Sequence, residues 1–281
     1  MKTSPIQRIL VPLDATEHAE AATRLACSVA KMHSAKLEGL TVVDLEHLDP
    51  KMSLLDKLHW PAAHEETAKA IANAREAMAA VRAKFAETCQ AEDVQHHEGG
   101  LTGLPATHIL EVSPLYDLIV MGMRTFFHFE GHGVADSLAK VLAHTATPVL
   151  AAPNGEPTPI KNVLVTYDGS VPSGRALRDF AYFAEPFDFK ITLFASHELE
   201  GHARNLLKNA GNCLKAHEIT EFETRTTKRA PLEALEEENL LDGVDLVVAG
   251  IHSRGSVREA FVGSFTSELI DRGGTALFLS H

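Results

Sequence analysis

The sequence predicts an α/β fold made of two tandem, doubly wound, parallel five-stranded sheets. Short apolar runs alternate with helical patterns along the chain, as in successive strand–helix–strand units. The pattern also occurs twice, because residues 9–14 resemble 163–168 and YDLIVMGM (116–123) resembles VDLVVAGI (244–251). These runs do not alternate with polar residues, so both faces of the strands are expected to be buried, which is typical of a parallel sheet.

Each copy contains five expected strands and four expected helices. In the first copy the strands are expected at 8–14, 36–43, 94–99, 118–123 and 148–152, and the helices at 16–33, 65–90, 105–113 and 136–144. In the second copy the strands are expected at 161–168, 190–196, 219–226, 245–251 and 275–279, and the helices at 173–184, 198–216, 231–241 and 264–272. The first copy is longer, and we expect much of its excess in 45–64, which has no clear period.

The repeat divides the chain into a first domain at 1–153, a linker at 154–159 and a second domain at 160–281. The linker NGEPTP contains two prolines, which is typical of an exposed connection.

Composition indicates a cytoplasmic protein that binds neither nucleic acid nor membrane. The 281 residues are 45% hydrophobic and carry a net charge of −12, which disfavours binding to anionic polymers and surfaces. No apolar run has the length of a membrane helix, and no signal-peptide core is present. The three cysteines are scattered, as expected of reduced thiols in the cytosol.

The stretch that follows the fourth strand of the second copy is the candidate ligand site. Ligands of such sheets bind beyond the carboxyl ends of the strands. Gly263 and Ser264 open a predicted helix, whose free N–H groups can receive a phosphate, with Ser264 as N-cap or phosphate contact. Gly250 at the end of the strand keeps the entrance to the loop free of side-chain bulk.

These features resemble the universal stress protein family, and the chain looks like a tandem member with two UspA-type domains. The ATP-binding branch of that family carries G-x2-G-x9-G-[ST] after its fourth strand. Gly250, Ser253, Gly263 and Ser264 reproduce the spacing, with Ser253 in place of the second glycine. The resemblance covers nearly the whole chain and implies an adenine nucleotide alpha-hydrolase-like fold.

The resemblance also implies a ligand, which is ATP or another adenine nucleotide in the second domain, with Mg²⁺ held through the phosphates. Asp168 matches the aspartate of the family after the first strand, which would face ribose or adenine, and Thr166 is a further expected nucleotide-binding residue. His252 and Thr266 stand where many nucleotide-binding members have the same residues. Arg254 could neutralise a phosphate, and Ser253 would either donate its hydroxyl or tilt the loop.

The first copy keeps the position of this site and changes its chemistry. Gly122-Met123-Arg124-Thr125 replaces the start of the motif, and Ala135-Asp136 replaces Gly-Ser. A carboxylate at Asp136 would cap the helix and repel phosphate. Phe126, Phe127 and Phe129 add bulk to the same loop. We therefore expect that the first domain does not bind ATP in the manner of the family.

Other roles stay open at this stage. A nucleotide-independent interaction scaffold and a slow hydrolase of ATP or a small molecule are the alternatives, although no catalytic residue can be named. Sixteen histidines, among them His128 and His132, raise the question of a metal, but surface roles are favoured because no HExxH or CxxC occurs. Ser173 is expected to be the N-cap of the helix at 174–184.

Family members often pair through the last strand. The resemblance therefore implies that the strands at 148–152 and 275–279 pair within this chain, with a homodimer as a further option. A covered sheet with an open edge gains by such pairing.

Overall fold

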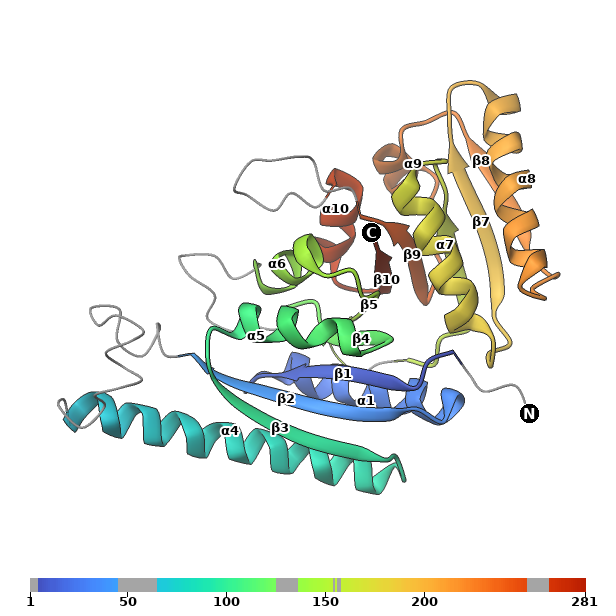
Figure 1. Ribbon diagram of the computed structural model, residues 1–281. Coiled ribbons are helices and arrows are strands. Elements are labelled where there is room, and N and C mark those ends of the chain that lie inside the picture. The colour runs from blue at the N-terminus through green and yellow to red at the C-terminus, as the bar shows by residue number, and fades with distance from the viewer. Residues whose placement is uncertain (1–4, 45–64, 125–135, 154, 156–157, 252–262) are drawn as a thin grey trace.

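The computed structural model describes residues 5–44, 65–124, 136–153, 155, 158–251 and 263–281. Within these residues the strands form one ten-stranded sheet with helices on both faces (Figure 1). The predicted α/β fold of parallel strands is confirmed. The two five-stranded units are continuous with each other, in the order β3-β2-β1-β4-β5-β10-β9-β6-β7-β8.

The first half of the sheet is built from five strands, which are β1 (Arg8–Leu13), β2 (Lys36–Asp44), β3 (His96–Gly103), β4 (Leu118–Gly122) and β5 (Val149–Ala152). Its helices are α1 (Glu17–His33), α4 (Glu65–Ala91), α5 (Pro105–Val112) and α6 (Asp136–His144), with a short 3-10 turn at Ser113–Leu115. Neighbouring strands within this half are parallel. β1 and β4 lie at its centre and are almost wholly buried, because helices cover both faces.

The second half repeats this order with β6 (Asn162–Thr166), β7 (Lys190–Ser196), β8 (Glu223–Thr227), β9 (Leu246–Gly250) and β10 (Ala276–Ser280). Its helices are α7 (Val171–Ala184), α8 (Glu200–Ala216), α9 (Pro231–Glu237) and α10 (Ser264–Arg272). These strands are also parallel to their neighbours. The halves join where β5 and β10 pair antiparallel, with Phe278 opposite Leu150.

Each half uses an aspartate before its fourth strand to hold the start of its first strand. Asp117 Oδ2 accepts the backbone N–H groups of Gln7 and Arg8 at 2.8 and 2.9 Å. Asp245 Oδ2 accepts those of residues 161 and 162 at 2.9 and 2.8 Å. The recurring aspartate in YDLIVMGM and VDLVVAGI therefore has the same mechanical role in both halves.

The core consists of two apolar layers, one on each face of the sheet. The first layer runs across both halves beneath α1, α4, α7 and α8, and the second lies beneath α5, α6, α9 and α10. His33 at the end of α1 is 1% exposed and packs against Phe183 and Phe187 of the second half, with ring centroids 5.8 and 5.6 Å apart. The two halves thus share a core as well as a sheet.

The structure corrects several predicted bounds. The edge strands β3 and β8 begin later than the predicted starts at 94 and 219, because their side chains are largely exposed and no apolar run marks them. Helix α7 begins at Val171, and its N-cap is Ser170, whose Oγ accepts the backbone N–H of Ser173 at 3.2 Å. The prediction that Ser173 is the N-cap is therefore wrong.

Helix α9 ends at Glu237, four residues before the predicted bound. No helix within the described ranges is long and apolar enough to cross a membrane. The predicted linker at 154–159 lies partly outside the described residues, and the domain bounds at 153 and 160 stay predictions.

Candidate functional site

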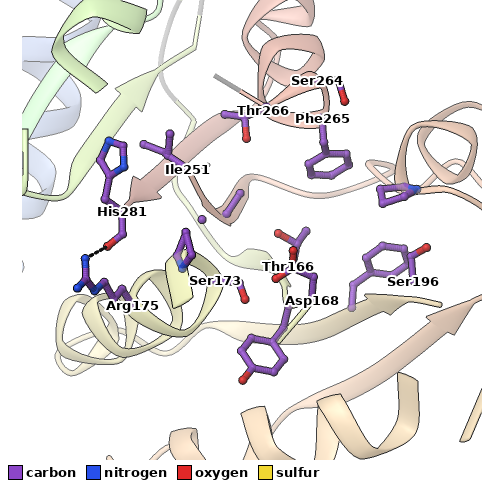
Figure 2. A pocket seen from close by; sticks show the side chains of 17 residues that line it. Thr166, Asp168, Ser173, Arg175, Ser196, Ile251, Ser264, Phe265, Thr266 and His281 are labelled. Carbon is purple, nitrogen blue, oxygen red and sulfur yellow. Dashed lines mark hydrogen bonds between the residues drawn. The ribbon is translucent and has the colours of Figure 1, made fainter. Parts of the chain in front are cut away.

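A pocket of about 840 Å³ opens at the carboxyl ends of the strands in the second half (Figure 2). The ends of β6, β7, β9 and β10 and the starts of α7 and α10 line it. Six of the nine predicted site residues lie in its wall, and these are Thr166, Asp168, Gly250, Gly263, Ser264 and Thr266. The other three, His252, Ser253 and Arg254, lie outside the described residues.

The end of β6 carries a turn that its own side chains hold. Asp168 Oδ1 accepts the backbone N–H of Ser170 at 2.9 Å, and Thr166 Oγ1 donates to the carbonyl of Val248 at 2.9 Å. The first half repeats the aspartate contact, because Asp14 Oδ1 accepts the N–H of Thr16 at 3.0 Å. The aspartate after the first strand is thus a turn residue in both halves. Asp168 is exposed where it faces the pocket, whereas Asp14 is buried.

Gly250 stands where the end of β9 meets the start of α7. A Cβ at this position would lie 2.4 Å from the carbonyl carbon of Pro172 and 2.4 Å from the backbone nitrogen of Ser173. Neither backbone atom can move aside without shifting the helix. The glycine therefore has a packing role, and it keeps the floor of the pocket open at the same time.

The start of α10 presents backbone to the pocket. Gly263 is the N-cap and Ser264 is the first helical residue, so the expectation of Ser264 as N-cap is wrong. A Cβ at Gly263 would meet nothing within 4 Å. Thr266, one turn into the helix, is 3% exposed and also lines the pocket. The first N–H groups of a helix lack intrahelical partners and carry partial positive charge, so they favour an anion.

Several lining residues could not be predicted from the sequence. Arg175 on α7 donates from Nη1 to the carbonyl of His281 at 3.4 Å, which joins the helix to the end of β10. His281 contacts the carbonyl of Leu142 through Nε2, so a residue of the first half supports the wall. Phe194 is 2% exposed and supplies apolar surface. Arg175 lies within a helix and His281 follows β10. Neither belongs to a sequence motif that would mark it as a site residue.

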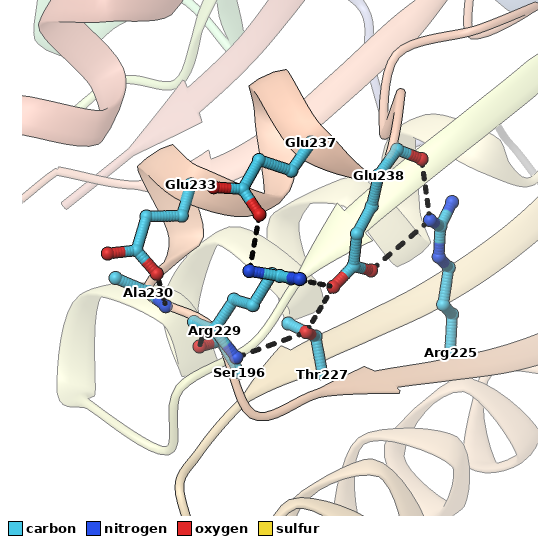
Figure 3. A network of polar contacts seen from close by, with 8 residues as sticks. All are labelled: Ser196, Arg225, Thr227, Arg229, Ala230, Glu233, Glu237 and Glu238. Atoms are coloured by element: carbon cyan, nitrogen blue, oxygen red, sulfur yellow. Dashed lines mark hydrogen bonds and ion pairs between the residues drawn. The ribbon is translucent and has the colours of Figure 1, made fainter.

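A polar network holds the rim of the pocket between β7 and α9 (Figure 3). Ser196 donates to the carbonyl of Arg229, and both Ser196 and Pro231 line the pocket. Glu238 accepts from Thr227 Oγ1 and from Arg225 Nη2, the latter at 3.3 Å. The backbone leaves the helical path at Glu238, and Asn239 then has a positive φ of 48°, so α9 ends before its predicted bound.

The corresponding region of the first half is only partly described. Residues 125–135, with the three phenylalanines, lie outside the described residues. Arg124, two residues beyond the end of β4, donates from Nη2 to the carbonyl of Asp271 at 3.1 Å, at the carboxyl end of α10. A guanidinium favours that end of a helix dipole. The expectation that this half does not bind ATP stays a prediction.

Within the described parts of the chain no group of three histidine, cysteine or acidic side chains could hold a metal ion. His128 and His132 fall outside those parts.

A sequence model of the universal stress protein family matches residues 5–153, which is more than half of the chain. The chain belongs to the universal stress protein family. The sequence has no significant match among the curated proteins.

Solved structures resemble both halves of this universal stress protein together. A universal stress protein from Archaeoglobus fulgidus DSM 4304 is similar with a TM-score of 0.73 at 19% identity, over 97% of each chain. A functionally unknown protein from Pseudomonas aeruginosa PAO1 is similar with a TM-score of 0.58 at 13% identity, over 99% of this chain and 93% of the other. At these identities the likeness establishes the fold alone.

The packing role of Gly250 leads to a first prediction. Gly250→Ala should lower the free energy of unfolding by about 2 kcal/mol, because the added methyl group overlaps backbone that cannot relax cheaply. Urea unfolding of the purified protein measures this. Gly263→Ala is the matched control, since its Cβ meets open space, and it should cost less than about 1 kcal/mol. Equal losses for the two variants would contradict the role assigned to Gly250.

Proposed function

We propose that this universal stress protein binds ATP or a related adenine nucleotide in the pocket of its second half. The observation that carries the proposal is the convergence of six motif residues from β6, β9 and α10 on one pocket. These residues are separated by up to 100 positions in the sequence, and the resemblance to the ATP-binding branch of the family points to the same residues. We infer a role in sensing or signalling during stress.

The phosphate end would lie at α10. Gly263 leaves its backbone accessible, and the exposed Ser264 adds a hydroxyl at the mouth of the helix. A phosphate there would accept hydrogen bonds from N–H groups that have no partner within the helix. The buried Thr266, two residues further along the helix, belongs to the same wall.

The nucleoside end would lie between β6 and β7. Asp168 supplies a carboxylate that can accept from ribose hydroxyls, while the buried Phe194 and Ala249 supply apolar surface for a base. The pocket thus offers polar groups at one end and apolar groups at the other, which suits an adenine nucleotide.

We also propose that the second half is a second UspA-type domain, although the family match covers only the first. The same strand order and the same aspartate contacts at 117 and 245 support this. Pairing of β5 with β10 would then be the contact between two such domains within one chain.

A nucleotide-independent scaffold is the second candidate. The favouring observation is that Asp168 and Gly250 each have a structural contact that needs no ligand. A chain that had lost nucleotide binding would retain both residues for folding alone.

Isothermal titration with ATP, ADP and AMP tests the proposal. Saturable binding to the wild-type protein is expected, and phosphate release in the same samples would reveal any hydrolysis. Asp168→Asn should weaken binding about tenfold, because it retains an acceptor for Ser170 but removes the charge that receives a ribose hydroxyl. Asp14→Asn makes the same change in the first half and should leave the affinity unaltered. No saturable heat at millimolar ATP would favour the scaffold.

A further inference from the structure

Two cysteines from separate helices meet in the core of the first half. Cys27 on α1 and Cys89 on α4 have their Sγ atoms 3.8 Å apart, although 62 residues separate them in the sequence. Their side chains are 1% and 0% exposed. The third cysteine, Cys213, lies half-buried on α8 in the other half of the molecule.

Ion pairs on both sides hold the two helices in register around these sulfurs. Lys84 Nζ lies 3.3 Å from Glu20 Oε1 on one side, and Lys31 pairs with Glu92 on the other. The partners advance together along α1 and α4, so the helices run in the same direction. The two cysteines therefore lie at matching heights on helices that run side by side.

We propose that Cys27 and Cys89 are a modification site, at which a hydroperoxide converts the thiol pair into a reversible disulfide. A disulfide needs its sulfurs about 2.0 Å apart. Closing the present separation takes less than about 2 Å of combined movement of the two sulfurs. Because both sulfurs are buried, the oxidant must be small, and hydrogen peroxide meets this condition.

The two thiols share a hydrogen bond that changes the pKa of each. This hydrogen bond lowers the pKa of the Cys27 thiol, while burial and Glu92 act against the shift and Lys31 acts in its favour. The hydrogen bond to Cys27 and burial both raise the pKa of Cys89. The sulfur that is deprotonated attacks the peroxide, since the thiolate is the nucleophile, and the other sulfur lies 3.8 Å away to complete the bond.

The reaction balances without a metal or cofactor. One of the two sulfurs attacks a peroxide oxygen, the O–O bond breaks, and the products are the sulfenic acid of that cysteine and one water. The other sulfur then attacks the oxidised sulfur, the S–O bond breaks, and a second water carries away the hydroxyl and the thiol proton. The two sulfurs lose two electrons in total, and the peroxide gains them.

The bond would link α1 to α4 across a long stretch of chain. Such a link restricts the unfolded chain, so the oxidised protein should resist unfolding more than the reduced protein. A dithiol would reverse the change.

The test uses the full chain with Cys213→Ala, which leaves the pair as the sole thiols. After peroxide treatment of the folded protein and alkylation in denaturant, the intact mass should be lower by two hydrogen atoms. Neither cysteine should be alkylated, and one cross-linked peptide pair should appear. Dithiothreitol should restore both thiols. Retained thiols, or a mass increased by oxygen atoms with no cross-link, would overturn the proposal.

The wild-type chain supplies a test that needs no variant. When folded, it should form the 27–89 bond alone, whereas the chain unfolded in urea should also form bonds to Cys213. The same mixture of disulfides from the folded and the unfolded chain would show that the fold does not direct the pairing. The midpoint of urea unfolding should rise on oxidation. In the matched variant Cys89→Ala, peroxide should leave the midpoint unraised, and an equal rise there would overturn the assignment.

Discussion

Acidification from about pH 7 to about pH 4 will lower the free energy of unfolding by about 3 kcal/mol through His33 alone. Burial lowers the pKa of His33 from 6.5 to about 4, while a hydrogen bond to the backbone of Phe183 acts weakly in the opposite direction. The unfolded chain therefore takes up a proton near pH 6.5, whereas the folded chain resists it until near pH 4. Stability from this group is complete above pH 6.5 and is lost as the pH falls towards 4.

Protonation of His33 should affect more than its immediate surroundings, because this side chain lies between the two halves. The imidazole ends α1 of the first half and packs against Phe183 and Phe187 at the end of α7 in the second half. A charge placed there would lie among aromatic rings in the shared core. Protonation should therefore loosen the contact between the halves together with the fold as a whole.

Urea unfolding at several pH values, compared between wild type and His33→Gln, measures this effect. Other groups titrate in both proteins, so the difference between the two curves isolates the histidine. His33→Phe fills the site without a titrating group. Its free energy of unfolding should therefore depend on pH as weakly as that of His33→Gln. Parallel curves for wild type and both variants would contradict the prediction.

Ser264→Asp is expected to weaken ATP binding about 100-fold while leaving the fold at least as stable. Ser264 is the first residue of α10 and lines the pocket. A carboxylate there would oppose a phosphate about 6 Å away with about 3 kcal/mol per charge at an effective dielectric constant near 20. The same carboxylate interacts favourably with the start of the helix, by about 0.3–1 kcal/mol. Binding and stability should thus change in opposite directions.

Ser267→Asp is the matched control for this variant. Ser267 lies on the same helix, is exposed and does not line the pocket, so the net charge changes equally. Titration calorimetry should show at most about a threefold loss for it, because its side chain lies one helical turn beyond the start of α10 and is exposed to solvent that screens its charge. Equal losses for both variants would place the phosphates elsewhere. Wild-type affinity for Ser264→Asp would do the same.

The sequence predicted the central strands well, because a strand that is buried on both faces consists mostly of consecutive apolar residues. β1, β4, β6 and β9 are continuous apolar runs, and each structural strand falls within its predicted range. The glycine spacing likewise selected residues that lie together at one end of the sheet. The edge strands β3 and β8 were misplaced at their starts, because a polar strand with an exposed face has no such signal.

The sequence by itself determined the α/β class and the repeat, because these depend on apolar periodicity and on recurring segments. Its resemblance to the universal stress protein family also indicated six of the residues that line the candidate site. Only the tertiary structure decided that Gly250 meets the backbone at Pro172 and that Cys27 meets Cys89. It also placed His33 in a core shared by both halves. Such contacts join residues far apart in the chain. No local pattern encodes them, because their distances follow from how the helices pack on the sheet.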